Sequence, residues 1–480
     1  MYQHSCVRHR WARALRHAVF LTGLSTSLWF ATPAQSAPAS TAVAAKPDAQ
    51  TLRIPPIAYR TRTLSNGLLV ISAPMQTSPT VSVQVWYRVG SKDDPQGRSG
   101  FAHLFEHMMF KSTKYMQSEQ LDRMTEDVGG SNNAFTADDT TAYHEVVPSN
   151  HLERLLWAEA ERMAHLNVDE ANFKSERAVV EEELRQRVLA EPYGRLFNAI
   201  PAASYRVHPY KRPGIGSIEE LEAASLDDVR NFHTTYYRPD DAVLVVTGDF
   251  DQAQLDAWVD RYFGAIQAPA AKIPRVTAVE PARSADAKVQ ITGPNVPLPA
   301  VAITWLIPPA ADADMPALKI AAALLGAGDS SRLYQSLVYR QQIASSVGID
   351  ADAHVDTGLL TAYAIASQGK SLDAVTKALD AEVARLAKQP ASAAELDKIR
   401  TQLVTSALLE RQTPLGLGMA LGNAAVIDGD VATVNTQLAA LQAVTAADVQ
   451  RVVRRYITGA RKVVIEYRAA AAAPSPKSPS

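Results

Sequence analysis

Cysteine is almost absent from this sequence of 480 residues, which contains only Cys6. Cys6 lies in an N-terminal segment that we expect to be removed, so the mature chain would contain no thiol. A metal ion would then have to be bound by His, Asp and Glu side chains, and no disulfide would cross-link the fold. The sequence therefore argues against thiolate metal sites and against small disulfide-stabilised folds.

An excess of positive charge is also lacking, since 48 Lys and Arg residues stand against 50 Asp and Glu residues. This balance gives no indication of a nucleic acid partner. Beyond the N-terminal segment, no stretch reaches the roughly 20 apolar residues that a membrane-spanning helix needs, so we expect no membrane span in the mature chain. Hydrophobic residues make up 47% of the sequence, which is enough for several domains with cores of their own.

The N-terminus has the order of a secretory signal peptide. Residues 1–17 carry four arginines and no acid, the apolar run "AVFLTGLSTSLWFA" follows, and the small residues "TPAQSAPAS" come next. We predict that residues 1–37 are a signal peptide, cleaved between Ala34 and Ala39, and that the protein is periplasmic. A membrane anchor is the alternative, but the apolar run is short for a span. Because the segment contains four positive charges, its removal shifts the formal net charge from −2 to −6.

The rest of the chain reads as two similar halves, residues 52–265 and 285–468, joined by a linker rich in Ala and Pro. The strand pattern "TVSVQVWYRVG" in the first half resembles "PAVAITWLIPP" in the second. Strands that are segregated from runs of helices indicate an α+β fold. Asn66-Gly67 predicts a hairpin with a two-residue turn, and residues 469–480 are expected to form a disordered tail.

The stretch "GFAHLFEHMMF", residues 100–110, carries the most informative polar residues. His103, Glu106 and His107 fall on one face of an apolar helix. Two imidazoles at i and i+4 can bind one zinc ion, and the glutamate between them is placed to act as a general base. The alternative is a pair of core histidines that only form hydrogen bonds. The corresponding helix of the second half, residues 316–328, contains no His and no Glu.

A catalytic zinc ion normally has three protein ligands, and the helix "SERAVVEEELRQR" offers Glu181, Glu182 and Glu183. Helical phase places Glu183 on the apolar face of this helix. Glu181 is four residues from an arginine on either side, which is typical of an exposed ion pair. Glu176 lies two turns before Glu183 on the same face and is predicted to orient a metal ligand.

These motifs resemble the inverted zincins of the pitrilysin, insulysin and mitochondrial processing peptidase family. The resemblance extends over nearly the whole mature chain and includes "SNNAFTADDTTAYHEV", "ERAVVEEEL", "HPYKRPGIGSIEEL", "YYRPDDAVLVVTGDF" and "LLGAGDSSRLY". It implies two homologous α/β-roll domains, each a mainly antiparallel sheet packed by helices on one face, and a zinc endopeptidase activity on peptides.

The resemblance also assigns individual residues. It implies one Zn²⁺ per chain, with ligands and catalytic groups at matching positions: His103, His107 and Glu183 as ligands, Glu106 as the general base, and Glu176 as an accessory acid. Members of the family bind substrate as an added strand on a sheet edge. The matching residues of this chain are Asn133, Ala134 and Phe135.

The chain departs from its self-sufficient relatives in the second half. Those relatives have an Arg and a Tyr that grip the substrate, whereas the aligned positions here hold Val338 and Ser345. This absence predicts a heterodimer in which a related subunit supplies the Arg and the Tyr. The alternatives are a self-sufficient homodimer that uses Arg340 or another group, and a scaffold subunit without activity.

Overall fold

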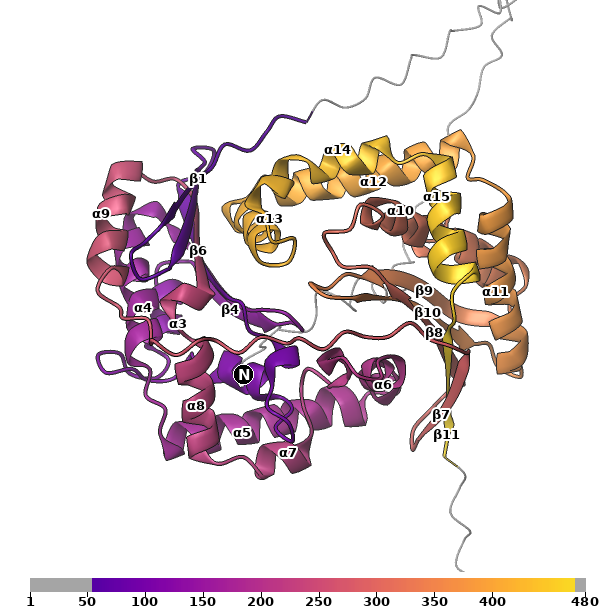
Figure 1. Ribbon diagram of the computed structural model, residues 1–480, viewed down its shortest axis with the longest axis horizontal. Coiled ribbons are helices and arrows are strands. Elements are labelled where there is room, and N and C mark those ends of the chain that lie inside the picture. The colour runs from indigo at the N-terminus through magenta and orange to yellow at the C-terminus, as the bar shows by residue number, and fades with distance from the viewer. Residues whose placement is uncertain (1–53, 471–480) are drawn as a thin grey trace, which may run out of the picture. The chain divides into compact units, whose positions relative to one another are not determined.

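The computed structural model describes residues 54–470. The predicted signal peptide, and the predicted tail beyond residue 470, lie outside the described residues. Two sheets form the framework of the described part (Figure 1). No helix between residues 54 and 470 combines the length and the apolar character that crossing a membrane requires.

The first half contains six strands and eight principal helices. In chain order they are β1 (Arg60–Thr63), β2 (Leu69–Pro74), β3 (Thr80–Tyr87), α2 (Phe101–Met108), α3 (Gln120–Glu126), β4 (Ser131–Thr136), β5 (Thr141–Pro148), α4 (Leu152–His165), α5 (Glu170–Leu184), α6 (Gly194–Ser204), α7 (Ile218–Glu222), α8 (Leu226–Tyr236), β6 (Ala242–Gly248) and α9 (Gln252–Phe263).

The second half contains five strands and six principal helices. They are β7 (Ala287–Gly293), β8 (Ala300–Ile307), α10 (Met315–Gly326), β9 (Ala344–Asp352), β10 (Gly358–Ala366), α11 (Leu372–Lys388), α12 (Ala393–Glu410), α13 (Pro414–Val426), α14 (Gln437–Ala443), α15 (Ala446–Val453) and β11 (Val463–Ala469).

The two sheets have the same topology. The first has the strand order β1-β2-β6-β3-β5-β4 and the second β7-β11-β8-β10-β9. In each sheet, the last strand of the half pairs in parallel with an early strand, as β6 does with β2 and β11 with β7. The other pairings are antiparallel. The predicted α+β class and the duplicated plan are confirmed, and β1 is an addition of the first half.

The predicted hairpin at Asn66-Gly67 forms, but its turn was predicted one residue too short. The amide of Leu64 donates to the carbonyl of Leu68, and the amide of Gly67 donates to the carbonyl of Leu64. Three residues, Ser65 to Gly67, therefore lie between the last paired positions. Gly67 adopts φ = 93°, a left-handed conformation that glycine reaches without strain.

Each sheet has helices of its own half on one face, as predicted, and a helix of the other half on the opposite face. Helix α13 of the second half packs on the first sheet through Leu417 and Leu421, which join Trp86 and Val245 in one buried cluster. Helix α6 of the first half packs on the second sheet, where its buried residues Leu196 and Ile200 contact a cluster from β8, β10 and β11. The halves thus exchange one helix each, which the sequence did not predict.

Two glycines let α13 lie close to β3. A Cβ atom on Gly418 would come within 2.3 Å of Gln84 Nε2, and one on Gly422 within 2.2 Å of the Trp86 ring. In this close approach Gln84 Nε2 donates to the carbonyl of Leu415 at 3.0 Å. Helix α13 is therefore tied to the first sheet by packing and by a hydrogen bond.

Candidate metal centre

Helix α2 carries the predicted motif and is fixed at its N-terminus by a buried carboxylate. Asp94 accepts hydrogen bonds from the amides of Gly100 and Ala102, at 2.7 Å and 2.9 Å. These are amides that the first turn of a helix leaves without an intrahelical partner. The apolar side chains of α2 enter the core of the first half, and His103 and Glu106 are buried with them.

The structure brings together the three predicted ligands. One side-chain atom from each of His103, His107 and Glu183 lies within 4.8 Å of the others. Glu183 Oε2 is 3.7 Å from His103 Nε2 and 3.3 Å from His107 Nε2. Glu183 lies on helix α5, which packs against α2.

The choice among the three consecutive glutamates agrees with the geometry. The side chain of Glu183 is 12% exposed, whereas that of Glu182 is 55% exposed. Glu181 pairs with Arg177 and Arg185, at 3.8 Å and 3.2 Å. The Glu181 side chain is also only 12% exposed, so the expectation of an exposed ion pair there is wrong. What distinguishes Glu183 is that its carboxylate faces the two imidazoles.

The donor set fits a zinc ion. Both ring nitrogens of His103 are buried, and neither has a hydrogen-bond partner within residues 54–470. A buried polar atom without a partner is costly, and a bound cation would remove that cost. Two imidazoles and one carboxylate are the donor types that zinc accepts in catalytic sites.

The charges of His103 and Glu183 suit a cation. Burial lowers the pKa of His103, which keeps its imidazole in the neutral form that binds metals. Burial alone would raise the pKa of Glu183, but the hydrogen bond from His107 and the nearby positive charges outweigh it and lower that pKa to about 2. Glu183 is thus a carboxylate over the whole neutral range. Although burial opposes it, hydrogen bonds to Glu176 and Glu183 raise the pKa of His107 to about 9, so that ring must lose a proton to bind a metal.

Three basic and acidic groups surround the ligands. Glu176 Oε2 lies 3.7 Å from His107 Nδ1, and Lys111 Nζ is 2.7 Å from Glu176 Oε1. Arg187 pairs with Oε1 of Glu183 and leaves Oε2 toward the imidazoles. Sequence reasoning placed Glu176 here but missed Lys111 and Arg187, although each stands four residues after a predicted ligand, the spacing of neighbours on a helix face.

The predicted general base is linked to the predicted substrate strand. Thr136 Oγ1 donates to Glu106 Oε2 at 2.7 Å, and Thr136 is the last residue of β4. Sequence reasoning missed this contact because the two residues lie on separate elements. Glu106 therefore sits beside the end of an edge strand.

Strand β4 contains Asn133, Ala134 and Phe135 and is the last strand of its sheet, paired with β5. The amide of Ala134 donates to Oδ1 of Asn133 at 2.9 Å. The ring of Phe135 packs edge-on against Trp86, with centroids 5.3 Å apart. The role of these three residues in substrate binding stays a prediction.

At the positions where self-sufficient relatives have a substrate-binding Arg and Tyr, the second half has Val338 and Ser345. Val338 packs against the core of the second half, and Ser345 is the second residue of β9, with its hydroxyl toward the carbonyl of Ile365. Arg332 precedes Tyr339 by seven residues, the spacing of Val338 and Ser345. It forms two hydrogen bonds with Glu395, at 2.9 Å and 3.1 Å. It is thus committed to a structural contact.

Two family models match consecutive parts of the chain. The family model described as "Insulinase (Peptidase family M16)" matches residues 69–217, and "Peptidase M16 inactive domain" matches residues 223–403. Zinc protease PqqE of Helicobacter pylori is 32% identical over 340 residues, which cover 70% of this chain and 77% of that protein. The chain belongs to peptidase family M16. The α10 region, which lacks the His and Glu motif, lies within the inactive-domain match of this M16 protein.

Two further similarities extend over most of the M16 chain. The probable mitochondrial-processing peptidase subunit beta of Arabidopsis thaliana is 26% identical over 406 residues, covering 83% of this chain and 76% of that protein. The crystal structure of a protease from Helicobacter pylori matches with a TM-score of 0.83 and 28% identity, covering 86% of this chain and 100% of that one. The two-sheet architecture is therefore that of solved M16-like structures.

Proposed function

We propose that this protein is a zinc-dependent endopeptidase subunit that hydrolyses unfolded peptides. The observation that supports this most is the convergence of His103, His107 and Glu183, with Glu106 on the same helix face. The three ligands would hold one Zn²⁺, which when bound polarises a scissile carbonyl and acidifies a water molecule.

In this proposal Glu106 moves the protons. Its carboxylate accepts a proton from the attacking water and then transfers it to the amine that leaves, so no covalent intermediate with the protein forms. The hydrogen bond from Thr136 holds one carboxylate oxygen of Glu106 in place. Glu176 and Lys111 orient the ring of His107 from its Nδ1 side.

Metal content and hydrolysis distinguish the ligands from the base. We expect His107→Ala to lose zinc, and Glu106→Gln to keep zinc while hydrolysis falls by about 10²- to 10⁴-fold. Exposed Glu126 lies on neighbouring α3, so Glu126→Gln is a matched control that should retain both. Near wild-type hydrolysis by Glu106→Gln would contradict the assignment of the base.

The assignment of Glu183 as the third ligand can be tested by comparison with the neighbouring Glu182. Glu183→Gln should weaken zinc binding, whereas Glu182→Gln should not, because the Glu182 side chain is turned to solvent and pairs with Arg185. The opposite pattern would exclude Glu183 as the ligand.

The position of β4 as the last strand of its sheet supports main-chain recognition of an extended peptide. The binding edge would consist of Asn133, Ala134 and Phe135. Thr136, the next residue, contacts the proposed general base Glu106. Since alternate amides of a strand point toward a neighbouring strand, N-methylation along a peptide substrate should raise KM at every second position. Equal sensitivity at all positions would count against edge pairing.

We further propose that the protein is periplasmic and works with a related subunit that supplies an Arg and a Tyr. The leader-like residues 1–37 support export, and Val338 and Ser345 support the division of labour. The purified chain should bind zinc but cleave peptides poorly, and co-expression with such a subunit should restore turnover. Full activity of the isolated chain would instead favour the self-sufficient enzyme, and an inactive pair would favour a scaffold.

A further inference from the structure

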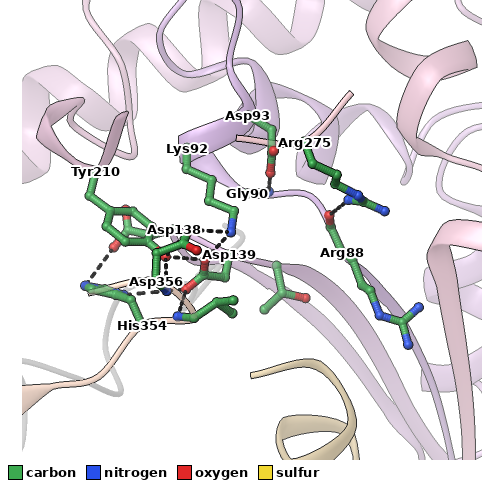
Figure 2. A network of polar contacts seen from close by, with 12 residues as sticks. Arg88, Gly90, Lys92, Asp93, Asp138, Asp139, Tyr210, Arg275, His354 and Asp356 are labelled. Atoms are coloured by element: carbon green, nitrogen blue, oxygen red, sulfur yellow. Dashed lines mark hydrogen bonds and ion pairs between the residues drawn. The ribbon is translucent and has the colours of Figure 1, made fainter. Parts of the chain in front are cut away.

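A second group of potential metal ligands shares no residue with the α2 site. Side-chain atoms of Asp138, Asp352 and His354 all lie within 4.8 Å of one another. Asp138 is in the turn between β4 and β5, Asp352 ends β9, and His354 follows it in the loop before β10. Figure 2 shows Asp138 and His354 gathered with Lys92, Asp139 and Tyr210.

The spacing within this group resembles that of the catalytic ligands. His354 Nε2 is 3.5 Å from Asp138 Oδ2 and 3.7 Å from Asp352 Oδ2. These separations exceed the roughly 2.7–3.2 Å of an ordinary N–H···O hydrogen bond. They match the 3.3 Å and 3.7 Å that separate Glu183 Oε2 from the two imidazoles of the first site.

The groups next to Nδ1 of His354 are also arranged like those next to Nδ1 of His107 in the first site. His354 Nδ1 lies 3.7 Å from Asp139 Oδ2, and Lys92 Nζ is 2.7 Å from Asp139 Oδ1. In the first site, His107 has the same arrangement with Glu176 and Lys111, at the same two distances. An acid behind the second ring nitrogen is usual for metal-binding histidines, because it fixes the tautomer that presents the other nitrogen to the metal.

Asp139 is held firmly in this supporting position. Its carboxylate accepts a hydrogen bond from Tyr210 at 2.5 Å and one from the amide of Val355 at 3.0 Å, besides the contact with Lys92. Its side chain is 2% exposed and that of His354 is 6% exposed. The imidazole therefore lies next to a buried carboxylate that three contacts hold in place.

The electrostatic balance also favours a cation. Asp138 and Asp352 place two carboxylates on one side of His354, and Asp139 places a third on the other. Lys92 pairs with Asp139 at 2.7 Å and with Asp356 at 3.3 Å, so the excess of negative charge lies with Asp138 and Asp352. Carboxylates this close repel one another, and a divalent cation between Asp138 and Asp352 would relieve the repulsion.

We propose that Asp138, Asp352 and His354 bind a structural divalent cation, with Zn²⁺ as the best candidate. An imidazole together with two carboxylates suits zinc and other late first-row ions, whereas Ca²⁺ and Mg²⁺ prefer oxygen ligands alone. Because Asp138 comes from the first half and the other two ligands from the second, the ion would fasten the β4–β5 turn to the β9–β10 loop.

The test is the zinc content of the full chain, loaded with Zn²⁺, freed of excess ion and measured by elemental analysis. The variants are His354→Asn and Asp352→Asn, each made in the wild-type chain and in the His107→Ala background, where the catalytic site is disabled. Asp350→Asn is the matched control, since Asp350 is an exposed acid on the same strand β9. Far-UV circular dichroism establishes which variants are folded.

We expect each of the two variants to contain one zinc ion less than its own parent, and the control to lose none. If His354→Asn fails to fold, Asp352→Asn decides alone. Equal zinc content in folded Asp352→Asn and its parent, in both backgrounds, would overturn the proposal and leave a metal-free cluster of ion pairs. Because the comparison is made within each background, it is independent of whether the catalytic site binds zinc.

Discussion

Lys111 offers a sharp test of how the proposed metal ligands are oriented. Its ammonium contacts Glu176 at 2.7 Å, and Glu176 in turn faces His107 Nδ1 at 3.7 Å. Lys111→Met removes the charge but keeps most of the aliphatic stem. Glu176 would then be free to turn away, and the ring of His107 would lose the group that fixes it.

The expected loss follows from the exposure of the two side chains. Replacing a group that orients a metal ligand typically costs 10- to 100-fold in metal affinity, or about 1.4–2.7 kcal/mol. The Lys111 side chain is 23% exposed, so water can partly replace its ammonium, and we expect a loss near the lower limit. Glu176→Gln should come nearer the upper limit, because the Glu176 side chain is only 9% exposed and the substitution leaves Lys111 without its counter-ion.

The assay is a competitive zinc titration of the full chain against a chromophoric chelator. Lys114→Met is the matched control, since Lys114 is exposed and its ammonium lies over the ring of Tyr115. Zinc affinity of Lys111→Met within twofold of both wild type and the control would refute the reasoning. Lys111→Arg should restore part of the loss, because it keeps a positive charge beside Glu176.

Two further predictions concern the scaffold. Gly422→Leu should lower the free energy of unfolding by about 1–3 kcal/mol in a denaturant titration, because the new side chain would overlap the buried Trp86 ring. The control is Gly214→Ala, which should be neutral because a Cβ atom there meets nothing within 4 Å. Equal stability of the two variants would contradict this packing. The hydrogen bond from Arg332 is the largest cause that lowers the pKa of Glu395, to about 2, so the stability that the pair contributes is complete above about pH 4.5 and is lost as the pH falls toward 2. Acid unfolding curves of wild type and Arg332→Met should therefore converge near pH 2, and a difference that persisted there would exclude this pair as its source.

The candidate metal ligands could be predicted from sequence because helical periodicity places them locally. His103 and His107 are one turn apart on α2, and Glu183 lies two turns after Glu176 on α5. The duplicated strand pattern likewise indicated two similar sheets. These features depend on spacing along one element, which a sequence displays directly.

What the sequence did not reveal depends on contacts between distant segments. The hydrogen bond from Thr136 to Glu106 joins a strand to a helix, and the group of Asp138, Asp352 and His354 joins two halves of the chain. The exchange of α6 and α13 was missed for the same reason, since an apolar helix face does not specify which sheet it covers.

The exchanged helices have a consequence for how the chain tolerates cleavage. Helix α6 covers the second sheet and α13 covers the first, so each fragment of a chain cut between α9 and β7 would carry the part that shields the other from water. Such fragments should stay associated after proteolysis, whereas either one expressed alone would present an uncovered apolar sheet face and aggregate. The integrity of this protein therefore rests on mutual coverage rather than on the continuity of its backbone.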